Sequence, residues 1–358
     1  MLYNRRKTRV VRVGSVAIGG SHPISIESMT NTYTADVEAT LTQIQALAAA
    51  GCEIVRLAVN NRPAAEGFAE IRRRVTDMPM IADIHFDHRL AIAAIEAGAD
   101  KIRINPGNIG DAAKVAAVVD AAKMRGIPIR IGVNSGSLEL DLVDKYGGVT
   151  GRGLAESALR NVRMLEDLNF DNIVVSIKAS NIPMTLEAHE IAAPAVDYPF
   201  HVGITEAGTL YSGTIKSAAG LAGLLTRGYG DTVRISLTAD PVEEIKAAKE
   251  LLKALQLRQF GPEIISCPTC GRTEVDLISL ADQVSQLIGH ITAPISIAIM
   301  GCVVNGPGEA KESDIGLSCG KGFGQLFAKG EVIRKVSENE MVPALIAEIE
   351  KIAKERAE

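Results

Sequence analysis

Three cysteines and one glutamate near the end of the chain have the residue types and spacing of a metal site. Cys267 and Cys270 form a Cys-x-x-Cys pair, and Cys302 follows in a glycine- and proline-rich run that ends at Glu309. A Cys-x-x-Cys pair can place two thiolates on one metal centre, and a tight turn lets a third cysteine join them. Three soft ligands suit either zinc or an iron–sulfur cluster.

The residues leave the fourth ligand of this site open. Cys319 is the default by softness, and an all-cysteine site would be a closed structural zinc or a saturated electron-transfer cluster. Glu309 is the oxygen-donor alternative, and it would leave one iron weakly held and exchangeable. The remaining cysteine, Cys52, follows a run of alanines and is expected to be a small core residue.

A second group of polar residues interrupts segments that are otherwise apolar. Strands buried in a parallel sheet are normally apolar throughout, and a buried unpaired guanidinium is costly. Cations at the ends of such strands are explained if they converge on an anion with about two phosphate groups. The alternative is that each cation pairs with a nearby carboxylate in a structural network. The interrupting residues are Arg56, Arg103, Arg130, Asn134, Lys178, Thr205, Glu206, Arg234 and Ser236.

The elements that must position these residues alternate between short apolar strands and helices rich in alanine and leucine. Eight such units predict a (β/α)8 TIM-type barrel, with a doubly wound open sheet as the alternative. In a barrel the strand C-termini form the active-site face, so the polar strand ends would lie together. The expected strands are residues 24–29, 54–59, 80–86, 101–106, 127–133, 173–178, 200–206 and 232–238.

Segments outside this alternation define the rest of the organisation. Residues 8–19 are expected to form a hairpin that plugs the bottom of the barrel, and residues 134–173 contain an extended βα loop on the active-site face. The alternation ends near residue 258, where glycines and cysteines become frequent. We therefore expect two domains: a barrel over residues 1–258 that binds the anion, and a smaller α/β domain over residues 259–358 that carries the metal site.

Composition limits the function classes. The net charge of −5 does not indicate a nucleic-acid-binding or membrane-surface protein. No apolar run reaches the roughly 18 residues of a membrane span, and the N-terminal sequence is not that of a secretory signal. Five cysteines in a long chain without such a signal favour reduced thiols and a cytoplasmic location.

The motifs resemble those of the 4-hydroxy-3-methylbut-2-enyl diphosphate synthase family, iron–sulfur enzymes of the methylerythritol phosphate route to isoprenoids. The match is collinear over nearly the whole chain, as in the two-domain bacterial form. The matching runs are SMTNT (28–32), GCEIVR (51–56), ADIHF (82–86), IRINPGN (102–108), RIGVNSGS (130–137), GITEAG (203–208), CPTCGR (267–272) and MGCVVNGPGE (300–309).

This resemblance implies a [4Fe–4S] cluster held by Cys267, Cys270, Cys302 and Glu309, with Cys319 buried or close by rather than a ligand. It implies that 2-C-methyl-D-erythritol 2,4-cyclodiphosphate is opened reductively and dehydrated, with electrons from a flavodoxin or ferredoxin. The residues implied to hold this substrate are Arg56, Arg103, Arg130, Asn134, Lys178, Thr205, Arg234 and Ser236. Glu206 is the expected proton donor; a salt bridge to a neighbouring arginine is its structural alternative.

Topology adds an expectation about assembly. The last barrel helix returns the chain to the bottom of the barrel, opposite the active-site face. A head-to-tail homodimer, in which each metal-binding domain covers the partner's barrel, would solve this problem, and the resemblance agrees.

The sequence is also compatible with two rival functions. One is a phosphate-binding barrel synthase or aldolase with a structural zinc domain, in which Lys178 forms a Schiff base. The other is a non-catalytic electron carrier.

Overall fold

A computed structural model of the chain describes residues 4–303, 308 and 311–357. These residues form two compact units, Met1–Arg258 and Gln259–Glu358, and each is described by itself. None of the described helices is long and apolar enough to cross a membrane.

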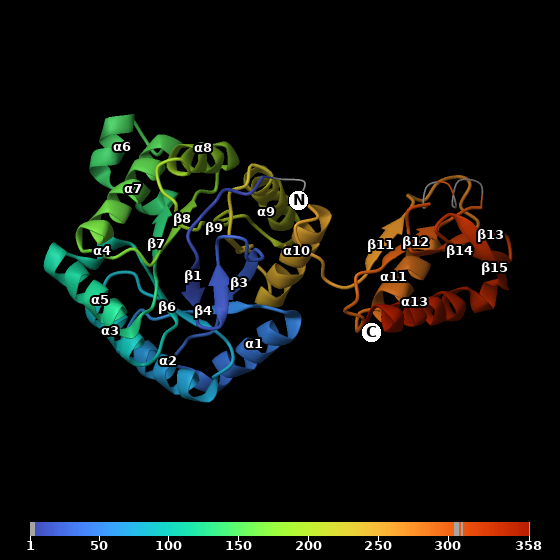
Figure 1. The fold of residues 1–358 in the computed structure, drawn as a ribbon, viewed down its shortest axis with the longest axis horizontal. Helices are drawn as coiled ribbons and strands as arrows, with labels where there is room; N and C mark the ends of the chain where they lie inside the picture. The colour runs from blue at the N-terminus through green and yellow to red at the C-terminus, as the bar shows by residue number, and fades with distance from the viewer. Residues whose placement is uncertain (1–3, 304–307, 309–310, 358) are drawn as a thin grey trace. The chain divides into compact units, whose positions relative to one another are not determined.

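The first unit is a barrel of eight parallel strands surrounded by helices (Figure 1). Each strand pairs with its neighbours in the sequence, and the last strand pairs with the first through Thr232 and Ser25. A bridge between Val175 and Phe200 completes the ring. The predicted barrel is therefore confirmed, and the open sheet is excluded. The strands are β3 (Ser25–Met29), β4 (Ile54–Ala58), β5 (Met80–Asp83), β6 (Lys101–Ile104), β7 (Ile129–Asn134), β8 (Ile173–Lys178), β9 (His201–Val202) and β10 (Thr232–Val233).

The outer helices begin and end at residues whose chemistry favours helix boundaries. The Asp240 side chain accepts a hydrogen bond from the Val242 N–H at the start of the last barrel helix, and Pro241 occupies its first position. Gly51 ends the first barrel helix in the left-handed conformation, at φ 93°. The helices are α1 (Val37–Ala50), α2 (Arg62–Arg74), α3 (His88–Glu96), α5 (Ala112–Arg125), α7 (Gly151–Asp167), α8 (Ile182–Ala192), α9 (Leu210–Leu225) and α10 (Pro241–Ala254).

Strands β5, β6, β9 and β10 end earlier than predicted, and β9 and β10 are shortened most. Regular pairing stops after Val202 in β9 and after Val233 in β10, whereas strands to residues 206 and 238 were predicted. The chain continues beside its neighbours through single hydrogen bonds, such as Thr205 N–H to Ala179 O at 3.3 Å. As a result, Thr205, Glu206, Arg234 and Ser236 lie in irregular segments just beyond the strand ends.

The bottom of the barrel is covered by an N-terminal hairpin, as predicted. Strands β1 (Val11–Val13) and β2 (Val16–Ile18) pair antiparallel around a turn that contains Gly14 at φ 55°. Val13 and Ile18 are fully buried against Ile54 and Ile81, near the beginnings of β4 and β5. The apolar side chains of the hairpin thus fill the end of the barrel opposite the strand C-termini.

The strand C-termini carry the additional structure. The short helix α4 (Pro106–Ile109) follows β6. The 3-10 turn η1 (Ser135–Ser137) and the helix α6 (Leu140–Tyr146) lie between β7 and α7. The long βα loop expected on this face is therefore present and partly helical.

Among its described residues, the second unit contains one five-stranded sheet and two long helices. Strands β11 (Glu263–Ser266), β12 (Ser296–Met300) and β13 (Ile315–Gly320) are parallel, and β14 (Phe323–Ala328) and β15 (Glu331–Ser337) continue the sheet antiparallel. Helices α11 (Leu277–Leu287) and α13 (Met341–Ala357) pack on the sheet and enclose a common apolar core; the turn η2 (Glu338–Glu340) precedes α13.

The apolar patterns of this unit predict strands over residues 295–300 and 331–335 and a helix over residues 340–357, and these correspond to β12, β15 and α13. Strands β13 and β14 were missed because glycines interrupt their apolar pattern. Gly316 pairs with Phe327 across the two strands, and a Cβ on Gly316 would lie 2.2 Å from the ring of Phe327. The aromatic ring therefore occupies the space that the glycine leaves, so these positions pack well without alternating hydrophobicity.

Candidate active site

A buried carboxylate, Glu27 on β3, organises the barrel interior. Both of its oxygens accept hydrogen bonds from Arg130 Nη1 on β7, at 2.6 and 2.8 Å. Lys101 on β6 lies 3.6 Å from the same carboxylate, and Arg56 on β4 lies 3.8 Å from it. One acidic side chain thus connects four strands of the ring.

Burial and charge act in opposite directions on this cluster. Burial by itself would raise the pKa of Glu27, but Arg130, Lys101 and Arg56 outweigh it and hold the pKa well below its ordinary value. Burial lowers the pKa of Lys101 to about 7 and that of Arg130 to about 10, although Glu27 partly offsets both changes. Glu27 is therefore ionised, and Arg130 is charged at neutral pH.

A second layer of ion pairs lies nearer the strand C-termini. Arg103 Nη1 donates to Asp83 on β5 at 3.1 Å, and Arg56 Nε lies 3.7 Å from the same carboxylate. Arg234 Nη2 lies 3.4 Å from Glu244 on α10. The structural alternative is therefore correct in part, because all four predicted arginines have a carboxylate partner.

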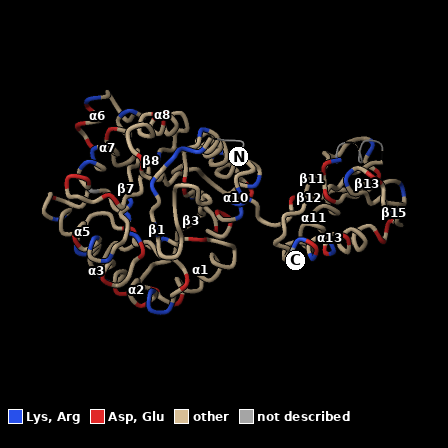
Figure 2. Tube along the Cα trace, in the orientation of Figure 1, with Lys and Arg blue, Asp and Glu red and all other residues tan. Residues whose placement is uncertain are grey.

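The pairing is nevertheless unbalanced. Five basic side chains share three carboxylates, and Figure 2 shows lysine and arginine on strands inside the helix ring as well as on its outer surface. Lys178 on β8 has no carboxylate within ion-pair distance among residues 4–303, 308 and 311–357. Its amino group instead lies 3.1 Å from His201 Nε2. This excess of positive charge is what an anion site requires. The basic and acidic side chains of this barrel cluster are Arg56, Lys101, Arg103, Arg130, Lys178, Arg234, Glu27, Asp83 and Glu244.

A cavity of about 270 Å³ opens at the strand C-termini beside this layer. Four predicted site residues line it: Arg103, Asn134, Thr205 and Glu206. The Asn134 amide, oriented with its oxygen toward the guanidinium, accepts from Arg103 Nη2 at 2.8 Å. The other predicted contacts do not line the cavity. Arg130 is 1% exposed and lies deeper, bonded to Glu27, while Arg56 and Lys178 are buried and Arg234 and Ser236 are partly buried.

Two glycines create the space for the cations. A Cβ on Gly132 of β7 would lie 2.2 Å from Arg103 Nε, and a Cβ on Gly203 would lie 2.9 Å from Lys178 Nζ. Neither site tolerates a side chain unless the cation moves. Both glycines therefore allow a long basic side chain to lie against the neighbouring backbone.

Glu206, the predicted proton donor, is exposed at the rim of the cavity. Its backbone adopts φ 52°, a conformation that non-glycine residues rarely take, and its carbonyl oxygen accepts from Lys216 Nζ at 3.2 Å. Its carboxylate has no ion-pair partner in the part of the chain that the structure describes. The salt bridge considered as an alternative role is thus not observed there.

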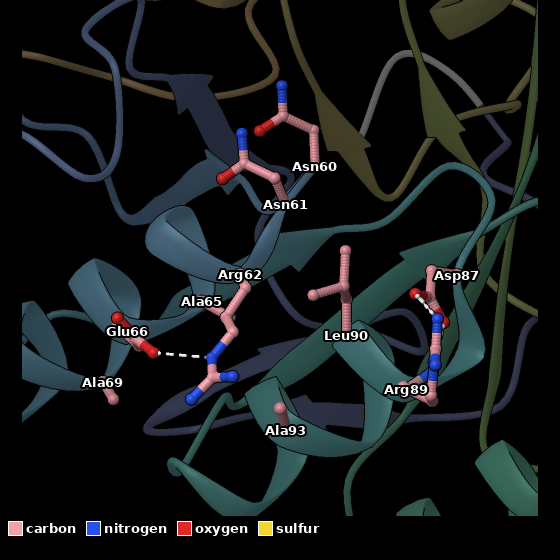
Figure 3. A pocket seen from close by; sticks show the side chains of 10 residues that line it. All are labelled: Asn60, Asn61, Arg62, Ala65, Glu66, Ala69, Asp87, Arg89, Leu90 and Ala93. Carbon is pink, nitrogen blue, oxygen red and sulfur yellow. Dashed lines mark hydrogen bonds and ion pairs between the residues drawn. The ribbon is translucent and has the colours of Figure 1, made fainter.

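A larger hollow of about 650 Å³ lies between α2 and α3 (Figure 3). Its cations are already neutralised, because Arg62 pairs with Glu66 at 2.9 Å and Arg89 pairs with Asp87 at 2.9 Å. All four side chains belong to the surface helices or the turns that precede them. The hollow lacks the charge excess of the barrel mouth and is a poorer anion site.

Two of the predicted metal ligands, Cys267 and Cys302, lie at one end of the sheet in the second unit. Cys267 follows β11 and Cys302 follows β12, its parallel neighbour. The Gly301 N–H donates to Cys267 Sγ at 3.3 Å, and the Cys270 N–H donates to Thr273 Oγ1 at 3.0 Å. A sulfur that accepts a backbone N–H suits a metal-bound thiolate, so the donor set fits an iron–sulfur cluster.

The described residues do not form a completed metal site. No three His, Cys, Asp or Glu side chains among residues 4–303, 308 and 311–357 gather closely enough to hold an ion. Glu309 lies outside the described residues. The structure therefore places Cys267 and Cys302 after neighbouring strands but does not bring three ligands together among the described residues.

The two remaining cysteines are buried. Burial raises the pKa of Cys319 on β13 to about 12, and the proximity of Cys267 adds to the shift. Its side chain is fully enclosed in the apolar core of the unit, whereas Cys267 and Cys302 are partly exposed and Cys270 is exposed. Cys52 is 6% exposed, its pKa is likewise raised by burial to about 12, and its thiol donates to Ile54 O at 3.2 Å.

A barrel with a cation-rich mouth, followed by an α/β unit that presents soft metal ligands, defines a two-domain barrel enzyme. The family model described as the GcpE TIM-barrel domain matches residues 8–249, and that of the GcpE protein C-terminal domain matches residues 263–351. The chain belongs to the GcpE family.

Curated relatives match over nearly the full length. The chain is 57% identical over 356 residues to 4-hydroxy-3-methylbut-2-en-1-yl diphosphate synthase (flavodoxin) of Anoxybacillus flavithermus, covering 99% of this chain and 98% of the relative. It is 56% identical to the enzyme of the same name from Geobacillus thermodenitrificans, with 99% and 94% covered. A solved N-acetylneuraminic acid synthetase from Leptospira borgpetersenii shares the fold at 13% identity, with a TM-score of 0.51 over 79% of this chain and 98% of that one.

The charge imbalance at the mouth predicts where a diphosphate binds. Arg103→Gln is expected to weaken the binding of inorganic pyrophosphate by about tenfold or more, because a hydrogen bond to a charged group contributes about 1.5–3 kcal/mol. Arg62→Gln, in the hollow between α2 and α3, is the matched control and should change affinity less than twofold. Isothermal titration calorimetry measures both, and equal losses in the two variants would contradict the assignment.

Proposed function

We propose that this chain converts 2-C-methyl-D-erythritol 2,4-cyclodiphosphate to 4-hydroxy-3-methylbut-2-enyl diphosphate in isoprenoid biosynthesis. The reaction opens the ring reductively with two electrons and releases a hydroxyl group as water. The observation that carries the proposal is the excess of buried cations at the mouth of a barrel whose relatives, 56–57% identical over nearly full length, bear this synthase name. The free thiols and the reductive chemistry agree with a cytoplasmic location.

The cations of the barrel mouth bind the cyclic diphosphate. Arg103 and Asn134 reach the cavity directly and hold one phosphate group, with Thr205 beside them. Lys178, Arg56 and Arg234 supply positive charge from just below, with Ser236 as a further hydrogen-bonding group. Arg130 acts from beneath, through the ion pair with Glu27. Holding the diphosphate among cations also makes it a better leaving group at the carbon where the ring opens.

The cluster domain holds the redox cofactor. Cys267, Cys270, Cys302 and Glu309 bind a [4Fe–4S] cluster, which supplies the electrons for the ring opening when it is bound. Glutamate as the fourth ligand leaves one iron with an exchangeable oxygen donor. The relatives' name indicates a flavodoxin as electron source, and a ferredoxin is the alternative.

Glu206 delivers the proton to the departing hydroxyl group. Its carboxyl lies at the rim of the cavity, it has no ion-pair partner among the residues described, and its backbone holds the sparsely populated conformation at φ 52°. The backbone conformation of Glu206 fixes the position of its side chain, and the exposed carboxyl group can still exchange a proton with solvent.

Replacing Glu206 tests this role. Glu206→Gln should lower kcat by about 100-fold or more, as general acids contribute about 10²–10⁴-fold, and leave KM and iron content within about twofold. Glu187→Gln, on the exposed surface of α8, should leave all three unchanged. Steady-state kinetics with a chemical reductant measure the effect; near-normal turnover of Glu206→Gln would exclude Glu206 as the donor.

The ligand set is tested by metal content. Cys319→Ala should keep a full iron complement and the brown absorption of the cluster, because its side chain is fully buried in the apolar core. Cys302→Ala and Glu309→Ala should each lower the iron bound per chain, with Cys52→Ala as the control that loses none. Elemental analysis after anaerobic reconstitution reads this directly. Loss of iron from Cys319→Ala with retention in Glu309→Ala, or zinc in place of iron, would contradict the assignment.

The active unit is a head-to-tail homodimer. The barrel ends at Arg258, whose Nη1 donates to Ile24 O at 2.8 Å and to Glu53 at 2.6 Å. These partners directly precede β3 and β4, so the chain leaves the barrel at the end opposite the cavity. In a head-to-tail dimer the cluster domain serves the cavity of the partner's barrel, so the chain does not have to run back along its own barrel.

Mixing two inactive variants tests this arrangement. Glu206→Gln disables the barrel and Cys302→Ala disables the cluster domain. If each cluster serves the partner's barrel, a mixed dimer retains one intact barrel facing one intact cluster. Co-expressed variants purified through two different tags should recover close to half of the wild-type rate per dimer. A rate no higher than that of either parent, or full activity of a monomer at high dilution, would contradict the head-to-tail dimer.

A further inference from the structure

Three buried groups on three strands connect the barrel interior to the anion site. His201 on β9 has no exposed surface, and its Nε2 lies 3.1 Å from Lys178 Nζ on β8. Its other ring nitrogen, Nδ1, lies 3.7 Å from Glu27 Oε2 and 3.5 Å from Thr232 Oγ1. The imidazole therefore lies between the carboxylate of Glu27 and the amino group of Lys178.

The surroundings of His201 select its tautomer. A carboxylate near Nδ1 favours the proton on that nitrogen, and the lone pair on Nε2 then faces Lys178. In this state the ammonium of Lys178 donates to His201, and its remaining N–H groups are free for an anion. The backbone of Gly203 confines the amino group from another side, because a Cβ on Gly203 would lie 2.9 Å from Lys178 Nζ.

We propose that His201 is a positioning residue that holds the Lys178 amino group toward the substrate site, and that Lys178 takes up a proton when the diphosphate binds. The proposal rests on the proposed function, because it concerns the same anion. Sequence analysis did not single out His201, and the interaction is visible only once β8 and β9 lie side by side.

The charges around Lys178 explain why its proton depends on the ligand. Burial lowers the pKa of Lys178 well below its ordinary value, and three arginines add to the shift while Glu27 opposes it. Burial also lowers the pKa of His201 well below its ordinary range, so the imidazole is neutral and can accept. The charged or titratable groups that face Lys178 are Arg56 on β4, Arg130 on β7, Arg234 after β10, Glu27 on β3, His201 on β9 and His189 on α8.

A bound diphosphate reverses this balance. Its negative charge favours the ammonium form and raises the pKa of Lys178, so a proton is taken up at any pH between the pKa of the free protein and that of the complex. Affinity is then greatest at low pH, where Lys178 is already charged, and decreases as the pH rises through the pKa of the complex. The cyclic diphosphate itself adds no proton in this range, since each of its phosphates has only one ionisable oxygen.

Calorimetric titration of the full-length holoenzyme with the cyclic diphosphate tests the proposal. Titrations at pH 8 in two buffers of different ionisation enthalpy count the protons exchanged. The wild-type protein should take up close to one proton per site, and Lys178→Met should take up none and bind at least tenfold more weakly. Uptake of no proton by the wild-type protein, with normal affinity, would overturn the inference and leave the proposed function intact.

Two substitutions of His201 separate positioning from a merely structural role. His201→Gln keeps an acceptor toward Lys178 and a donor toward Glu27, so its affinity should stay within about threefold of wild type. His201→Phe keeps the ring but loses both contacts. It should bind about tenfold more weakly at pH 8 and recover part of that loss as the pH is lowered, because a lower pH favours the ammonium form of Lys178.

The control for folding is the thermal unfolding temperature of both variants. Equal losses of affinity in His201→Gln and His201→Phe at every pH would overturn the positioning role. A wild-type protein that fails to bind the cyclic diphosphate at any pH would overturn both this inference and the proposed function.

Discussion

The barrel depends on one buried carboxylate that keeps several cations inside a ring of apolar strands. Burying a guanidinium or ammonium without a partner is prohibitive, and removing one member of a buried pair typically costs about 3–5 kcal/mol. Glu27 meets this requirement by accepting both hydrogen bonds from Arg130 while lying within 4 Å of Lys101 and Arg56. With the lower layer held in this way, the upper layer can carry more positive than negative charge. That surplus at the strand C-termini is the physical basis of the proposed diphosphate site.

The fold places the surplus where a substrate can reach it. Parallel strands in register bring Asp83, Arg103 and Asn134 to one end of the barrel, and the hairpin β1–β2 fills the other end. Gly132 lets the Arg103 side chain lie flat against β7. The early end of regular pairing in β9 releases Thr205 and Glu206 into loops, which gives the proposed acid its unusual backbone conformation. Catalytic geometry thus arises from departures from regular barrel structure at one face.

Much of this could be predicted from the sequence, for identifiable reasons. Strands buried on both faces leave continuous apolar runs, so all eight barrel strands were predictable, and the polar residues within them marked the mouth. Glu27 and His201 were missed because only basic residues within the strands were used to locate the site, and not the groups that neutralise and orient them. The glutamate within SIESM interrupts an apolar strand in the same way as the arginine within IVRLA. The partners Asp83 and Glu244 depend on register and helix packing, which sequence spacing does not specify. In the second unit, Phe327 packs over Gly316, so β13 and β14 pair closely without a regular alternation of apolar and polar residues, and their sequences do not indicate strands.

We propose that the cation-rich mouth of the barrel binds a cyclic diphosphate and that a [4Fe–4S] cluster with one exchangeable iron reduces it. Mössbauer spectra of the anaerobic, iron-57-loaded enzyme, recorded with and without 2-C-methyl-D-erythritol 2,4-cyclodiphosphate, test it most directly. We predict one iron site of the [4Fe–4S] cluster that is distinct from the other three and changes its parameters when the substrate is added. A spectrum in which all four irons are equivalent and insensitive to the substrate, or a protein that binds zinc instead, would contradict the account.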